Sequence, residues 1–116
     1  MPRSPLVALS DIVEAIELAR EATSGLTLSG FQADRVRRAA TERALLTLSE
    51  AVRHLPAEVL SRHPDLRWND IRGMGNRLRH EYWIVDSKIV WEVVRNELDR
   101  LYDAARVELA KLDDLA

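Results

Sequence analysis

The sequence predicts an all-α fold, arranged as an up-down four-helix bundle with one additional short helix. Apolar residues recur at spacings of three and four almost throughout, and no segment shows the strict alternation of a strand. The connections between the helical segments are short, which favours antiparallel neighbours. With 116 residues, of which 47% are hydrophobic and 31% charged, the chain suits one domain over residues 1–116 with a core of its own.

The first half of the chain contains two long predicted helices and one short one. The first begins at Pro5, because Ser4 is a favoured capping residue and proline is favoured at the first helical position. It ends near Gly25. Pro56 ends the second helix or begins a short one. The segments after the first helix are a loop over 24–30, a helix over 31–55 and a short helix over 56–62.

The second half contains two further predicted helices. A turn at residues 63–65 precedes a helix that spans roughly Trp68 to Tyr82. Asp86 is a typical N-cap, and the apolar stripe that follows it predicts a last long helix that reaches about Leu112.

The composition excludes several kinds of chemistry. The chain has no cysteine, so disulfides, thiolate catalysis and cysteine-based zinc sites are excluded. Its histidines, His54, His63 and His80, are not at metal-ligand spacing, and we expect neither a metal nor a cofactor. No apolar run approaches 18 residues and the amino terminus has no apolar signal segment, so we expect a cytoplasmic protein with no membrane contact.

The segment from Trp68 to Tyr82 departs from an ordinary bundle helix. At 100° per residue, one group of apolar residues falls within an arc of about 120°, which predicts the core face. These residues are Trp68, Ile71, Met74, Leu78 and Tyr82. His80 lies opposite this arc, with Gly73, Asn76 and Arg77 around it, and Asn76 is its i,i+4 neighbour. The pattern favours close approach of another chain or a ligand, although an ordinary surface histidine stays possible.

Charge is unevenly distributed along the chain. Residues 62–80 hold five arginines against two acids, whereas residues 97–116 hold six acids against three bases, within a net charge of −2. A net charge of −2 argues against a protein that coats nucleic acid, but it leaves a local basic site open. The arginines are either a solvated helix face or a phosphate-binding patch, since guanidinium groups match phosphate oxygens.

Two glycines lie inside this predicted helix, and each costs about 1 kcal/mol relative to alanine. Gly73 lies on the polar face, where close packing would account for it. Gly75 lies between the two faces, and no packing reason for it is evident.

These residues resemble the HepT-like toxins of the HEPN superfamily. The resemblance covers nearly the whole chain. It is carried by Phe31, Ser49-Glu50-Ala51, Trp68, the Gly-Met-x-Asn-x-Leu-x-His-x-Tyr pattern over 73–82, Asp86 and Trp91.

The resemblance implies a function. Family members are all-helical homodimers whose two motif helices face each other and form a composite cleft. They are metal-independent RNA endonucleases, the toxins of type VII-like toxin–antitoxin modules, with an Arg-x4-His-x-Tyr motif. Their partner is a minimal nucleotidyltransferase antitoxin of the MntA type, which silences the toxin by attaching AMP to the motif tyrosine (AMPylation).

Carried over to this chain, the resemblance makes His80 the catalytic histidine and Tyr82 the AMP acceptor. Asn76 is a supporting residue that would orient the imidazole or a phosphate. Arg72, Arg77 and Arg79 are the candidate RNA-binding residues.

The family arginine does not carry over, because its position holds Gly75. The chain is then either a naturally inactive relative or one with an introduced inactivating substitution, and the unexplained helical cost of Gly75 favours the second. The alternative function is a non-catalytic HEPN dimer, acting as a binding module or as the AMP-acceptor substrate of a nucleotidyltransferase. A bundle adaptor with no role toward nucleic acid is a third.

Overall fold

The computed structural model describes residues 4–81 and 86–115. Within these ranges the chain forms helices and no strand, which confirms the all-α prediction. The helices are α1 (Pro5–Thr23), α2 (Leu28–Ala33), α3 (Arg35–Arg53), α4 (Ala57–Arg62), α5 (Trp68–Glu81), α6 (Ser87–Asn96) and α7 (Leu98–Leu115).

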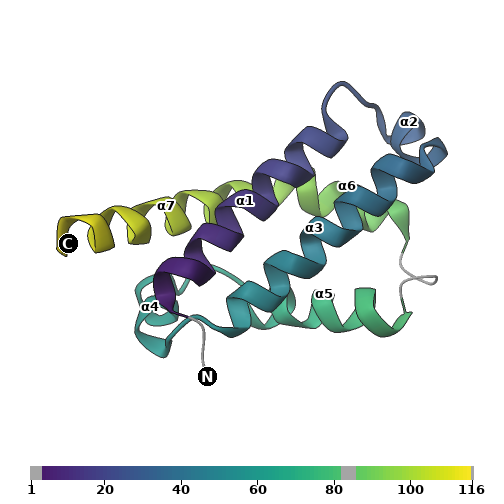
Figure 1. The fold of residues 1–116 in the computed structure, drawn as a ribbon. Coiled ribbons are helices and arrows are strands. Elements are labelled where there is room, and N and C mark those ends of the chain that lie inside the picture. Colours follow the sequence, from purple (N-terminus) through teal and green to yellow (C-terminus); the bar gives the residue numbers. More distant parts are fainter. Residues whose placement is uncertain (1–3, 82–85, 116) are drawn as a thin grey trace.

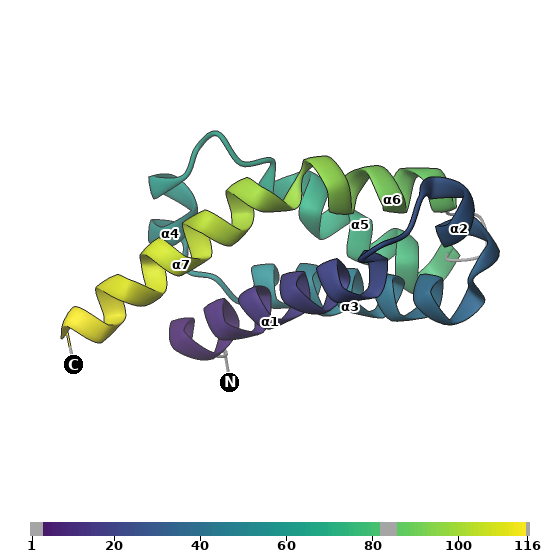
Figure 2. The same cartoon turned by 90° about the horizontal axis from the view of Figure 1, so that it is seen from above.

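The long helices run up and down beside one another (Figure 1). Helix α3 is antiparallel to α1 and to α5, which lie on either side of it in Figure 1. Helices α6 and α7 together form a rod that crosses behind α1 in that view and lies on one side of α1 and α3 in Figure 2. The most extensive contacts join α1 to α3, α3 to α5 and α1 to α7. The position of α5 in the bundle therefore depends mainly on its packing against α3.

The predicted start of the first helix is confirmed. The Ser4 hydroxyl accepts a hydrogen bond from the Val7 N–H at 3.2 Å, and Pro5 follows as the first helical residue. After the helix, Gly25 has a φ of +75°, a backbone angle that few residues other than glycine adopt, and the chain turns there.

Apolar side chains from three helices form the centre of the core. They include Ile12 and Ile16 of α1, Leu45 and Leu48 of α3, and Leu101 of α7.

The predicted loop at 24–30 and the predicted helix at 31–55 are wrong in their boundaries. Leu28–Ala33 is a helix of its own, and Asp34 separates it from α3 by capping the Arg37 N–H at 3.0 Å. Helix α2 forms because Phe31 is fully buried, with its ring 5.3 Å from that of Trp91. Burial of this ring outweighs the continuity that the sequence pattern suggests.

The last predicted helix is also divided. Asp86 caps it as predicted, accepting from the Lys88 N–H at 2.8 Å, but α6 ends at Asn96 and α7 begins at Leu98. None of the helices in the described part of the chain is long and apolar enough to span a membrane.

Candidate functional site

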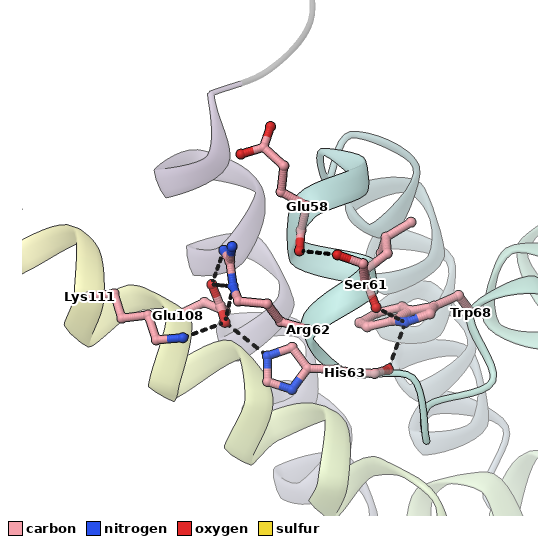
Figure 3. A network of polar contacts seen from close by, with 8 residues as sticks. Glu58, Ser61, Arg62, His63, Trp68, Glu108 and Lys111 are labelled. Carbon is pink, nitrogen blue, oxygen red and sulfur yellow. Dashed lines mark hydrogen bonds and ion pairs between the residues drawn. The ribbon is translucent and has the colours of Figure 1, made fainter.

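Helix α5 carries most of the predicted site residues, and its first residue is firmly anchored. The Trp68 indole N–H donates to the backbone oxygens of Leu60, at 3.2 Å, and His63, at 3.1 Å. Both acceptors belong to α4 and the turn after it, so the tryptophan fixes the start of α5 to this turn (Figure 3).

The same turn is held to α7 by Glu108, an almost fully buried carboxylate (Figure 3). Arg62 donates to both of its oxygens, at 2.6 Å from Nη2 and 3.1 Å from Nε, and His63 Nε2 lies 2.9 Å away. Lys111 is a third partner, at 3.3 Å. The hydrogen bonds from Arg62 first, and then from His63 and Lys111, lower the pKa of Glu108 from 4.5 to about 2.

The predicted core face of α5 is confirmed as far as the structure describes it. Leu78 is buried, and Trp68, Ile71 and Met74 pack against the core while staying partly exposed. Tyr82, the fifth residue of the predicted arc, lies outside the described residues.

The explanation of the two helical glycines is the reverse of the expected one. A Cβ at Gly73 would meet nothing within 4 Å, so close packing does not account for it. A Cβ at Gly75 would lie 2.8 Å from the Cβ of Ser49 in α3 and closer still to its Oγ. Gly75 is buried at this contact, so its helical cost has a packing reason, and that cost no longer favours an introduced substitution.

Polar residues of α3 and α5 meet beside this contact and form what we call the seam cluster: Glu50, Arg53, His54, Asn76 and Arg79. The Glu50 carboxylate is at its centre, 2.8 Å from Arg79 Nη2, 4.0 Å from Arg53 Nε and 3.8 Å from His54 Nε2. Arg53 Nη2 also donates to Asn76 Oδ1 at 3.0 Å. The side chains are partly exposed, so the cluster is accessible to a ligand.

Several arginines of the predicted basic patch are paired within the chain. Arg62 binds Glu108, Arg67 lies 4.0 Å from Asp70, and Arg79 binds Glu50. These pairs neutralise much of the positive charge counted along the sequence. Of the three predicted RNA-binding arginines, Arg79 is in the seam cluster and Arg72 is 3.5 Å from the Asn69 side-chain oxygen.

Arg77, the third, lines a groove of about 730 Å³ on the other side of α5. The groove separates α5 from α6 and α7, and its lining is mainly apolar. The apolar residues include Ile71, Met74 and Leu78 of α5 and Ile89, Val90 and Val93 of α6. Arg77 therefore faces a different surface from Arg79.

The remaining site residues are only partly described. His80 belongs to α5, but its side chain lies outside the part of the chain that the structure describes, as does the whole of Tyr82. Asn76 precedes His80 by four residues, and its amide oxygen binds Arg53. Among the described residues, no three acidic or histidine side chains gather as a metal site requires.

Comparison with known proteins identifies the family. A family model described as ribonuclease HepT-like matches residues 12–108, which include every residue of the seam cluster and of the groove lining. The chain belongs to the ribonuclease HepT-like family. The resemblance inferred from the motif is thereby confirmed.

Two curated relatives of this HepT-like chain match over nearly their full lengths. One, named as a probable ribonuclease HepT, from Thermococcus cleftensis, is 34% identical over 101 residues, 87% of this chain and 92% of its own. The other, named as a candidate RNase, from Caldanaerobacter subterraneus subsp. tengcongensis, is 32% identical over 109 residues, 94% of this chain and 97% of its own. No solved structure gives a significant match.

The sequence pattern missed part of the seam cluster of this HepT-like chain. Arg53 and His54 lie at the end of α3, more than 20 residues before Asn76 in the chain, and only the packing of α3 on α5 brings them beside it. Ser49 and Glu50 carried the family resemblance, but nothing in their spacing indicated that they contact Gly75 and Arg79.

Proposed function

We propose that this HepT-like chain is a metal-independent RNA endonuclease with His80 as its acid–base residue and a reduced rate of cleavage. The observation that carries the proposal is the family match over residues 12–108. It is supported by the polar seam that flanks the helix of His80.

The chemistry needs few groups from the protein. RNA supplies its own nucleophile, the 2′-hydroxyl, which attacks the adjacent phosphorus as the bond to the 5′-oxygen breaks. An imidazole near its ordinary pKa removes the hydroxyl proton or protonates the leaving oxygen, a contribution of roughly 10²–10⁴-fold. Negative charge builds on the phosphoryl oxygens, where a guanidinium stabilises it.

Gly75 removes one guanidinium from this scheme. The loss of one such electrostatic donor lowers a rate by on the order of 10²-fold or more. We therefore expect weak cleavage by the chain as it stands.

We further propose that the active form is a homodimer with a composite cleft. The groove between α5 and the α6–α7 rod supports a second copy as its occupant, because it is largely apolar and lies along the motif helix. Ile89, which lines it, leaves 45% of its surface exposed, and a dimer would cover it.

The cellular role proposed here is that of a toxin held inactive by an MntA-type nucleotidyltransferase. Transfer of AMP to the Tyr82 hydroxyl, with pyrophosphate released from ATP, would add negative charge two residues from His80 and repel RNA phosphate. Mass spectrometry after incubation with the partner and ATP tests this step. The expected AMP adduct is lost in Tyr82→Phe and kept in Tyr102→Phe, and an adduct that survives Tyr82→Phe would contradict it.

A second function is favoured by the contact between Gly75 and Ser49. Because this contact fills the place of the family arginine, the chain would serve as a non-catalytic HEPN dimer that binds RNA or accepts AMP. Incubation of a single-stranded RNA with the purified chain in the presence of a chelator distinguishes the ribonuclease from the non-catalytic dimer. The ribonuclease proposal expects slow cleavage that His80→Ala abolishes, and cleavage equal in both proteins would refute it.

A further inference from the structure

The contact between Gly75 and Ser49 leaves α5 without an arginine beside α3, but α3 itself places one there. Arg53 lies in the last turn of α3, and its Nη2 donates to Asn76 Oδ1 at 3.0 Å. Asn76 directly follows Gly75 in the chain and precedes His80 by one helical turn. The guanidinium of Arg53 is thus bound to the motif helix next to the position that lacks one.

The charges of the seam cluster favour an anion at Arg53. The cluster holds two guanidinium groups and one carboxylate, so it keeps a net positive charge even with His54 neutral. Glu50 is 2.8 Å from Arg79 but 4.0 Å from Arg53, so its charge is compensated chiefly by Arg79. The charge of Arg53 is the less neutralised of the two.

Arg53 also has the geometry to bind a phosphate. Its side chain is 36% exposed. A guanidinium has five N–H donors, and the bond to Asn76 uses only one of them. The bond to Asn76 restricts the side chain, so less conformational freedom is lost when a phosphate binds.

We propose that Arg53 is the phosphate-binding guanidinium of this chain's RNA site, in place of the arginine that position 75 lacks. This inference rests on the proposed function, because it assumes that RNA is the ligand of the motif helix. It distinguishes Arg53 from Arg77, which lines the groove on the other side of α5, and from Arg79, which is paired with Glu50. The phosphate would lie at the seam between α3 and α5.

The salt dependence of RNA binding tests this assignment. For a single strand, each neutralised phosphate contributes about 0.7 to the slope of log K against log salt concentration. We therefore expect Arg53→Gln to lower that slope by about 0.7 for a short single-stranded RNA oligonucleotide, whereas Arg53→Lys keeps it. Arg43→Gln, an exposed arginine two to three turns earlier on the same helix, is the matched control and leaves the slope unchanged.

The outcomes separate this inference from the proposed function. If the wild-type chain binds RNA and Arg53→Gln has the wild-type slope, Arg53 holds no phosphate and the inference is overturned alone. If Arg43→Gln lowers the slope as much as Arg53→Gln does, the inference is also overturned, because the effect is then one of overall charge. If the wild-type chain does not bind RNA, both proposals fail. Thermal unfolding of each variant verifies that the variant is folded.

Discussion

Gly75 of α5 lies so close to Ser49 of α3 that the structure leaves no space for a side chain between them. A Cβ at position 75 would be 2.8 Å from the Ser49 Cβ, and the Ser49 hydroxyl is already bonded to the Leu46 backbone oxygen at 3.0 Å. The close packing of the motif helix on α3 thus occurs at the position to which the resemblance assigns the family arginine.

The two glycines of α5 should respond in opposite directions to the same substitution. Gly73→Ala meets nothing within 4 Å, so we expect it to raise the free energy of unfolding by about 0.5–1 kcal/mol. Gly75→Ala gains the same helical propensity but overpacks against Ser49, at a cost of roughly 1–3 kcal/mol. We expect it to be destabilising overall, as measured by urea unfolding, and stabilisation by both alanines would contradict the close contact.

Glu108 should make the stability of the chain depend on pH in the acidic range. Since its pKa falls from 4.5 to about 2 on folding, it contributes stability above pH 4.5 that is lost as the pH falls toward 2. Glu108→Gln removes the charge that Arg62 and His63 bind, and we expect it to cost about 1–3 kcal/mol at neutral pH.

Urea unfolding of the two proteins across this pH range checks the assignment. The difference in stability between wild type and Glu108→Gln should shrink as the pH falls from 4.5 toward 2, because the wild-type carboxylate becomes protonated. A difference that stays constant over this range would show that the charge of Glu108 is not responsible.

The groove beside α5 should be the dimer surface. We expect the wild-type chain to sediment as a dimer and Ile89→Asp, which places a charge in the groove, to sediment as a monomer. Val36→Asp is the matched control, because Val36 is 74% exposed on α3 and does not line the groove. Equal behaviour of the two variants would rule out the groove as the interface.

The sequence predicted the helices whose ends carry a strong local signal. Ser4 and Pro5 begin α1, Trp68 begins α5, and Asp86 caps α6, as expected from capping and from apolar periodicity. The breaks at Asp34 and Glu97 were missed because the apolar spacing continues through both. Thr27 and Asp34 are favoured capping residues, and this was the available signal for α2 and α3.

The sequence predicted which residues of α5 belong to the candidate site, but not which residues of other helices contact them. Helical phase placed Leu78 in the core and Arg77 on the opposite side of the helix, but it could not show which helix lies against each flank. The role of Gly75 depends on Ser49, and the environment of Asn76 depends on Arg53, both more than 20 residues away in the chain. Such contacts follow from tertiary packing rather than from periodicity.

The central claim is that a HepT-like histidine site persists in this chain and lacks one guanidinium at position 75, where Gly75 packs against Ser49. The most direct measurement is RNA cleavage by the double variant Ser49→Gly with Gly75→Arg. Glycine is needed at position 49, since the Ser49 Cβ alone already lies within 3 Å of a Cβ at position 75. Gly75→Arg with Ser49 intact serves as the control for the packing conflict.

We expect the folded double variant to cleave single-stranded RNA on the order of 10²-fold faster than the wild-type chain, and to lose this activity in His80→Ala. A folded double variant that cleaves no faster than wild type, or whose cleavage persists without His80, would contradict the account.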